Sequence, residues 1–176
     1  MTTPRDFETL VLPHLQAAFN FARWLVHDHQ VAEDVVQDAF LRAYRYFDSL
    51  RGDDARPWLL AIVRNNCYTW LEEQRTEPGR VELDDDLIDK LPAHEHGQET
   101  DPGIALERER TRKLVDHALR ALAPPFREVV VLRELEGLSY AEIAHVAAIP
   151  IGTVMSRLSR ARAELKTTLA ALRGRN

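Results

Sequence analysis

The chain has 176 residues, 45% of them hydrophobic and 29% charged, which suits one domain or two small ones with real cores. No apolar run approaches the roughly 18 residues of a membrane span, and the N-terminus, MTTPRDFETL, lacks a signal-peptide pattern, so we expect a cytoplasmic protein. The single cysteine, Cys67, excludes an internal disulfide and suits a reducing compartment.

The net charge of −5 is distributed unevenly along the chain. Residues 1–74 carry −4, residues 75–102 carry −6, and residues 103–176 carry +5. A basic surface is the electrostatic signature of a nucleic-acid binder. Only the C-terminal part of the chain has that signature.

Residues 5–26 predict a helical region that Pro13 splits or kinks, because proline lacks the amide donor of a helix interior. A second helix, over 31–47, shows a strong 3.6-residue period. Leu41 falls outside the apolar stripe of that helix, among polar residues, which is a hint of a docking surface. The two predicted inward faces consist of Phe7, Leu10, Val11, Leu15, Ala18, Phe19, Ala22 and Leu25, and of Val31, Val35, Val36, Ala39, Phe40, Ala43, Tyr44 and Phe47.

Residues 51–56 form a short polar loop, and Pro57 is placed to open a helix that runs to about Gln74. Its apolar side contains Trp58, Leu59, Ile62, Val63, Trp70 and Leu71. Its other side is expected to show Arg64, Asn65, Tyr68 and Thr69. An aromatic ring among hydrogen-bonding groups and a cation can hold unpaired bases, although such residues also occur on many ordinary surface helices.

Periodicity disappears over residues 75–101, which hold prolines, glycines and the acidic run 84–86, and we expect a flexible acidic linker there. The His94-Glu95-His96 triplet resembles a metal site only superficially. No internal repeat is present, and we expect neither a metal ion nor another cofactor.

Asp101-Pro102 predicts the start of a helix that continues to about Leu122. Pro124-Pro125 then opens a helix over 126–136, which Gly137 ends. The inward residues of the first helix are expected to be Thr111, Leu114, Val115, Ala118 and Leu122. No strand pattern occurs, so the chain is expected to be all-α, with two small helical domains joined by the linker.

The stretch 137–166, GLSYAEIAHVAAIPIGTVMSRLSRARAELK, predicts a helix-turn-helix. Ser139 and Glu142 form a capping box for the first helix, and Ile149-Pro150 ends it before a second helix begins near Ile151. One side of the second helix is apolar: Ile151, Val154, Leu158, Ala161, Leu165, Leu169 and Leu172.

The opposite side of this second helix is polar and basic. Short polar side chains beside arginines suit base edges, and flanking cations suit phosphates. A solvated basic helix that closes an ordinary bundle would carry similar charges. Gly152, Met155, Ser156, Ser159 and Arg160 are expected to face outward, flanked by Arg157, Arg162 and Lys166.

Three segments in one order resemble an extracytoplasmic-function (group four) sigma factor of bacterial RNA polymerase, a branch of the sigma-70 family. They are VAEDVVQDAFLRAYRYF (31–47), RPWLLAIVRNNCYTWL (56–71), and PPFREVVVLRELEGLSYAEIA followed by IPIGTVMSRLSRARAEL (124–165). The resemblance covers nearly the whole chain. It implies a region-two domain over 1–74, a linker over 75–101, and a region-four domain over 102–176.

The resemblance also implies roles for particular residues. Core RNA polymerase would be bound through Asp34, Gln37, Asp38, Leu41 and Arg42. The single-stranded minus-10 element would be held by Arg51, Asp53, Asp54, Arg56, Arg64, Asn65, Tyr68 and Thr69. The duplex minus-35 element would be read by Thr153, Met155, Ser156, Arg157, Ser159, Arg160 and Arg162. A protein of this family is also expected to be held inactive by an anti-sigma factor until a signal arrives.

This chain departs from the family pattern in three places. Ala148 stands where the turn of the helix-turn-helix usually has glycine, so that turn must tolerate a Cβ. Met155 replaces a residue that is commonly basic. The melting helix ends in Glu72-Glu73-Gln74 rather than in a basic cluster, which weakens phosphate contacts there.

Two other classes remain open from the residues alone. An autonomous helix-turn-helix regulator would share the C-terminal motif, but it would need a dimer interface or a ligand pocket of its own. A metal-dependent hydrolase is disfavoured, because only His29, His96 and His145 have an acid three or four residues away. No phosphate loop or nucleophile elbow is present either.

Overall fold

The computed structural model describes residues 4–76 and 101–175, and within these ranges the regular secondary structure is helical throughout. This confirms the expected all-α fold. The helices are α1 (Pro4–Leu10), α2 (Leu15–Val26), α3 (His29–Arg45), α4 (Ala55–Thr76), α5 (Pro102–Ala121), α6 (Pro124–Val130), α7 (Tyr140–Ala147) and α8 (Ile151–Arg173). The expected flexible linker and the triplet 94–96 lie outside the described residues, apart from residues 75, 76 and 101 of the linker.

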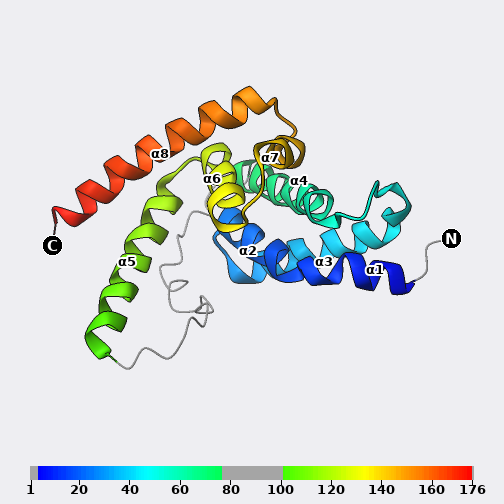
Figure 1. The fold of residues 1–176 in the computed structure, drawn as a ribbon, viewed down its shortest axis with the longest axis horizontal. Helices are drawn as coiled ribbons and strands as arrows, with labels where there is room; N and C mark the ends of the chain where they lie inside the picture. The colour runs from blue at the N-terminus through cyan, green and yellow to red at the C-terminus, as the bar shows by residue number, and fades with distance from the viewer. Residues whose placement is uncertain (1–3, 77–100, 176) are drawn as a thin grey trace.

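Pro13 separates α1 from α2, as the sequence predicts, and the break is a 3-10 turn at Leu12–His14. α2, α3 and α4 pack against one another to form the body of the N-terminal half (Figure 1). α1 is held over α3 by the ring of Phe7. Its edge-on aromatic contacts, with ring centroids 5.3 to 6.4 Å apart, are with Phe40, Tyr44 and Phe47.

α4 begins at Ala55, two residues earlier than expected, because the Asp54 carboxylate accepts a hydrogen bond of 3.2 Å from the Arg56 amide. Such a contact satisfies an amide that a helix start leaves without a partner. The helix then runs to Thr76, past the expected end near Gln74. A second short 3-10 turn, Phe47–Ser49, links α3 to the loop that precedes α4.

α5 begins at the predicted cap, where the Asp101 carboxylate accepts from the Gly103 amide at 2.9 Å. α6 begins at Pro124 and continues as a π-helical turn, Val131–Leu135, before Gly137 takes the left-handed backbone with φ of 68°. α6 packs against α8, and α5 extends outward from that pair (Figure 1).

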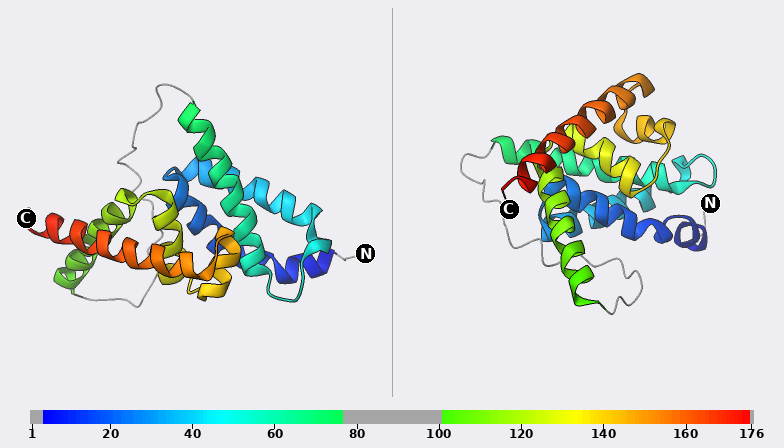
Figure 2. Two further views of the ribbon diagram at one scale, coloured as in Figure 1. Left: turned by 90° about the horizontal axis from the view of Figure 1, so that it is seen from above. Right: turned by 60° about the vertical axis from the view of Figure 1, so that its left-hand side comes forward.

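The two halves of the chain pack directly on each other. α4 contacts α7, and α2 contacts α6 (Figure 2). The buried side chains of both halves form one continuous cluster. The buried members include Leu59 and Val63 from α4 and Val129 and Ile143 from the C-terminal half. The side chains of this cluster are therefore shielded from solvent in this structure.

Most residues that the helical period predicts to face the core are buried or half-buried, and a few at the edges of the apolar faces are exposed instead. The exposed exceptions are Leu15 (47%), Tyr44 (59%), Thr111, Val115 (39%) and Ile151 (47%). A period identifies a face but not how far the neighbouring helix covers it, so edge positions depend on tertiary packing. Phe21 and Leu60, which the pattern did not single out, are fully buried.

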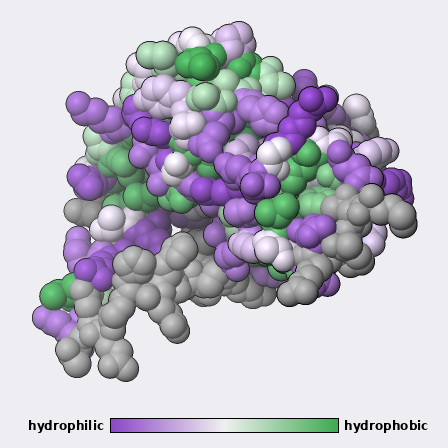
Figure 3. All heavy atoms as spheres, turned by 45° about the vertical axis from the view of Figure 1, so that its right-hand side comes forward, coloured by the Kyte–Doolittle hydropathy of each residue, from purple (hydrophilic) through white to green (hydrophobic). Residues whose placement is uncertain are grey.

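No described helix combines the length and the apolar character needed to cross a membrane. On the face drawn in Figure 3, hydrophilic and hydrophobic side chains are interspersed.

Candidate nucleic-acid interface

The helix-turn-helix begins with the predicted capping box. The Ser139 hydroxyl accepts from the Glu142 amide at 3.2 Å, and the Glu142 carboxylate accepts from the Ser139 amide at 2.6 Å. That second hydrogen bond lowers the pKa of Glu142 below its usual value. The reciprocal pair fixes where α7 starts.

The turn between α7 and α8 contains Ala148 in the left-handed conformation, with φ of 53°. The sequence suggested a turn that accommodates a Cβ, and the turn instead keeps the conformation that glycine favours. Left-handed backbone costs an L-residue about 1–2 kcal/mol. Two hydrogen bonds hold the geometry: the Ala148 amide donates to the His145 carbonyl at 3.3 Å, and the Ile149 amide to the Ala144 carbonyl at 3.1 Å.

α8 has a buried side and an exposed side, as predicted. The buried side consists of Val154, Leu158 and Ala161, each with 0 or 1% of its surface exposed. The exposed side consists of Gly152, Met155, Ser156, Ser159 and Arg160, with the half-buried Thr153 beside it. The first turns of α8 thus offer a polar surface backed by a rigid core.

The cations on the exposed side of α8 are held only by surface contacts. Arg160 lies 4.9 Å above the Phe126 ring and 3.3 Å from the Glu164 carboxylate. Arg162 pairs with Glu134 at 2.6 Å, and the hydrogen bond with Glu134 raises its pKa. Surface ion pairs are worth about 1 kcal/mol or less, so a DNA phosphate or base can replace these partners.

Arg157 differs from the other two arginines because it turns toward the protein interior. Its side chain is 27% exposed and lies 3.5 Å from the carboxylate of Glu128 on α6, which is fully buried. The sequence analysis placed Arg157 beside the outward face and did not anticipate Glu128. A carboxylate in the apolar run FREVVVL was the available signal.

The residues expected to hold the minus-10 strand fall into two groups. The first group is exposed and consists of Arg51, Asp53 and Asp54 in the loop and Asn65 and Thr69 on α4. The Asp54 carboxylate caps α4. The other three members, described next, contact the C-terminal half.

Arg64 and Tyr68 are not on an open face, which corrects the expectation from the helical pattern. The Arg64 guanidinium donates hydrogen bonds of 2.7 and 3.3 Å to the Glu128 carboxylate, and lies 4.2 Å above the Tyr68 ring. The third member, Arg56, donates to the backbone carbonyl of Glu136 and lies 3.3 Å from its carboxylate.

The electrostatics of this cluster follow from burial. Burial raises the pKa of Glu128, and the hydrogen bond from Arg64 opposes that rise. Burial alone would lower the pKa of Arg64, but the hydrogen bond and the charge of Glu128 outweigh it and raise the value. Burial, reinforced by the charge of Glu128, raises the pKa of Tyr68. The cluster is a desolvated ion pair capped by an aromatic ring.

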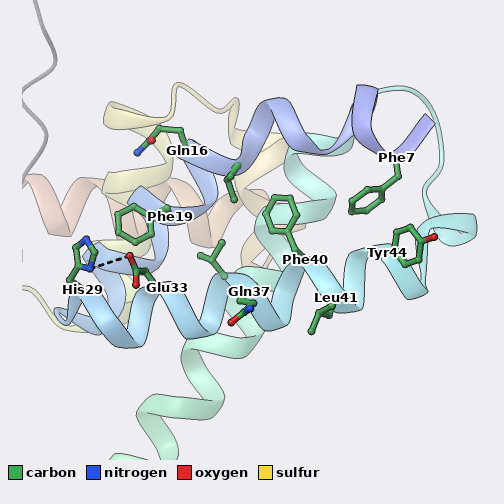
Figure 4. Close-up of a pocket in the computed structure, with 11 residues that line it drawn as sticks. Phe7, Gln16, Phe19, His29, Glu33, Gln37, Phe40, Leu41 and Tyr44 are labelled. Carbon is green, nitrogen blue, oxygen red and sulfur yellow. Dashed lines mark ion pairs between the residues drawn. The ribbon is translucent and has the colours of Figure 1, made fainter. Parts of the chain in front are cut away.

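The residues expected to bind polymerase share the exposed side of α3. Asp34, Gln37, Asp38, Leu41 and Arg42 are all exposed, and Leu41 is 63% exposed, as predicted. Gln37 and Leu41 also line a hollow of about 670 Å³ whose other walls the sequence analysis did not identify. Figure 4 shows Phe40 pointing from α3 toward α1 and α2, with Phe7 and Phe19 on either side.

Among the residues that the structure describes, no three potential metal ligands come together. His29 pairs with Glu33 at 3.5 Å, and both side chains are solvated. The architecture is that of a two-part helical protein with a C-terminal DNA-binding helix-turn-helix.

Comparison with known proteins identifies the family of this architecture. Residues 10–77 match the family model for sigma-70 region 2, and residues 112–165 match that for sigma-70 region 4. The chain is 34% identical over 174 residues to the RNA polymerase sigma-H factor of Pseudomonas aeruginosa, covering 96% of this chain and 88% of that protein. It is 38% identical over 131 residues to the ECF RNA polymerase sigma-E factor of Escherichia coli K12, covering 73% of this chain and 69% of that protein.

A solved structure shows the same fold. The sigma factor RpoE of Bartonella quintana, in complex with the anti-sigma factor NepR, superposes with a TM-score of 0.74 at 29% identity, over 94% of this chain and 98% of that one. The chain belongs to the sigma-70 family, in its extracytoplasmic-function group. It is a sigma factor of RNA polymerase, which confirms the expected family and function.

Proposed function

We propose that this sigma factor reads promoters through two surfaces and binds core polymerase through a third, and that it does so without catalysing a reaction. The observation that carries the proposal is the two-sided α8. Its buried residues Val154 and Leu158 fix the helix, while Ser156, Ser159 and Arg160 are exposed at its N-terminal end. The N-terminal end of a recognition helix is the part that reaches base edges in the major groove.

In this proposal residues 102–176 form the minus-35 reading domain. Ser156, Ser159 and Arg160 contact bases, and Thr153, Met155 and Arg162 lie at the edge of the groove. Arg157 supports the helix from behind through Glu128, and it contributes to DNA binding mainly by fixing α8. An arginine donates two parallel hydrogen bonds to guanine, which makes Arg160 the residue most able to discriminate.

Residues 1–74 form the minus-10 and polymerase-binding domain in the same proposal. Asn65, Thr69 and the loop residues Arg51 and Asp53 are accessible to a single strand, and Arg64 and Tyr68 become accessible when the halves separate. The α3 surface centred on Leu41 contacts polymerase, and residues 75–101 connect the domains. The site of action is where the polymerase works, in the cytoplasm.

We further propose that an anti-sigma factor regulates this chain. The support is the likeness to RpoE of Bartonella quintana, whose solved structure contains the anti-sigma factor NepR. Co-purification of the tagged chain from its native host, followed by identification of bound proteins, tests this part. Constitutive promoter activity together with the absence of a bound inhibitor would contradict it.

The main proposal is tested by run-off transcription with core polymerase on genomic promoter fragments. Transcripts with defined start sites should require the chain, and they should disappear when either promoter element is mutated. An autonomous regulator would instead bind its operator tightly without polymerase and initiate nothing with core enzyme alone. That pattern in a parallel anisotropy titration would contradict the proposal.

A further inference from the structure

The carboxylate of Glu128 joins three helices at the contact between the two halves of the protein. It has no solvent-exposed surface, and it lies 2.7 Å from Arg64 on α4 and 3.5 Å from Arg157 on α8. A buried charge is tolerated only when it is paired and hydrogen-bonded. Glu128 therefore requires both arginines while the halves are packed.

The two arginines belong to two different proposed DNA surfaces. Arg64 is in the minus-10 set, and Arg157 is in the minus-35 set. Tyr68, the aromatic residue of the minus-10 set, lies under the Arg64 guanidinium, and its hydroxyl is enclosed by protein. A base cannot stack on the face of the Tyr68 ring that the Arg64 guanidinium covers.

We propose that Glu128 is an autoinhibitory contact, which holds Arg64 and Tyr68 against α6 in the free protein and so withdraws part of the minus-10 surface from single-stranded DNA. The carboxylate occupies the position that a DNA phosphate would take beside Arg64. This inference rests on the function proposed above and adds a closed resting state of the chain itself.

Two further contacts between the halves act in the same direction. The Arg56 guanidinium donates to the carbonyl of Glu136, and the Arg127 guanidinium donates to His27. Together with the Arg64 pair, they join α2 and α4 to the C-terminal half at three places. A partner opens such a state only by binding the open form more tightly than the closed one.

The conformational test uses two fluorescent labels on the full chain. Arg45→Cys on α3 and Lys166→Cys on α8 place thiols at exposed positions in the two halves. Opening of the halves can expose the natural Cys67, which is fully buried and electrostatically coupled to Glu128, so every labelled chain also carries Cys67→Ala. Energy transfer between the labels then reports whether the halves are packed.

In this labelled chain, Arg64→Ala and Glu128→Gln should each lower the transfer efficiency, because each breaks a buried pair and raises the open-to-closed ratio about a hundredfold. The matched controls are Arg75→Ala, whose pair with Glu72 on the same α4 is exposed, and Glu134→Gln, whose pair with Arg162 is exposed. Both controls should retain the wild-type efficiency. Wild-type efficiency in both Arg64→Ala and Glu128→Gln, with helical circular dichroism intact, would overturn the proposal.

The binding test uses a labelled single strand of about 12 nucleotides that carries the minus-10 sequence of a promoter found by run-off transcription. Glu128→Gln should bind it at least about tenfold more tightly than the wild type, because Arg64 and Tyr68 are released. Adding Arg64→Ala to Glu128→Gln should reverse most of that gain, although the halves remain open. Equal affinity of Glu128→Gln and wild type would overturn the proposal.

Failure of the autoinhibitory contact and failure of the proposed function give different results. If run-off transcription requires the chain but no variant changes the energy transfer, the sigma function stands and the closed state is wrong. If no promoter is transcribed, the proposed function is wrong, and the energy-transfer measurement still decides whether Glu128 holds the halves together.

Discussion

The guanidinium of Arg127 on α6 donates a hydrogen bond to Nε2 of His27, the residue that ends α2. The contact requires a neutral imidazole, because a protonated ring has no lone pair to accept with. Burial and the positive charges of Arg127 and Arg120 lower the pKa of His27 to about 3.

This contact predicts that acid destabilises the packed state. His27 binds a proton near pH 6.5 in the unfolded chain but only near pH 3 in the folded structure. Its contribution to the free energy of unfolding is therefore complete above pH 6.5 and is lost as the pH falls toward 3. Between pH 6.5 and pH 5 the free energy of unfolding should fall by about 2 kcal/mol. Urea unfolding of wild type and His27→Asn at both pH values measures it, since asparagine tolerates the left-handed backbone of this position.

His29→Asn is the matched control, because His29 is solvated and lies only two residues away. This variant should lose as much stability as the wild type over the same pH range. A loss that is equal in wild type and in His27→Asn would mean that His27 does not carry the pH dependence.

Arg160→Ala should reduce discrimination at one position of the minus-35 element by about 1–3 kcal/mol, the usual effect of losing one base contact. Competition transcription between the cognate promoter and minus-35 point variants measures it. Arg173→Ala, an exposed arginine at the far end of the same helix, should leave the preference unchanged. Unchanged preference in Arg160→Ala would show that α8 docks in another orientation.

The α3 surface is tested by a double variant, Asp38→Arg with Leu41→Ala, in a titration with core polymerase. Leu41 is 63% exposed beside the aromatic hollow, so removing it should weaken core binding and leave folding intact. Leu12→Ala changes another leucine that is 45% exposed and lies outside the hollow. Equal core affinity of the α3 variant and Leu12→Ala would remove this surface from the mechanism.

Gly137 and Ala148 both have left-handed backbone. Replacing glycine by alanine at the first should lower stability, and replacing alanine by glycine at the second should raise it. Gly137→Ala should destabilise the protein by about 1–2 kcal/mol because its φ is 68°, although open space surrounds the added Cβ. Ala148→Gly relieves the same strain but gives the unfolded chain more freedom, so its net gain should be about 1 kcal/mol or less. Chemical unfolding of the two variants measures both, and destabilisation by Ala148→Gly would contradict the account of the turn.

Local patterns were sufficient for the features that depend on neighbours in sequence. The Ser139 capping box, the break at Pro13 and the two sides of α8 were all predicted, because caps, proline and helical period act within a few residues. α4 starts two residues before the position that Pro57 predicts, because the carboxylate of Asp54 caps the helix earlier. Three motifs in family order identified the family.

The packing of one half against the other could not be predicted in this way. Arg64 and Tyr68 occupy polar positions in the period of α4, and only the approach of α6 withdraws them from solvent. Glu128 shows the same effect from the other side: its place in the apolar run FREVVVL indicates burial, but only the approach of α4 and α8 determines which arginines it meets. The hollow beside α3 likewise depends on how α1 is placed over Phe40 and Tyr44.

Arg64 belongs to the proposed minus-10 surface and also pairs with the buried Glu128, and this combination has an evolutionary consequence. A substitution of Arg64 selected for a new minus-10 preference would at the same time change the equilibrium between packed and separated halves. Asn65 and Thr69 are exposed on the same helix, and the Thr69 hydroxyl donates to the backbone carbonyl of Asn65. If the proposed function holds, promoter preference would diverge more readily through Asn65 and Thr69 than through Arg64, because a change at Arg64 would also alter its buried pair with Glu128.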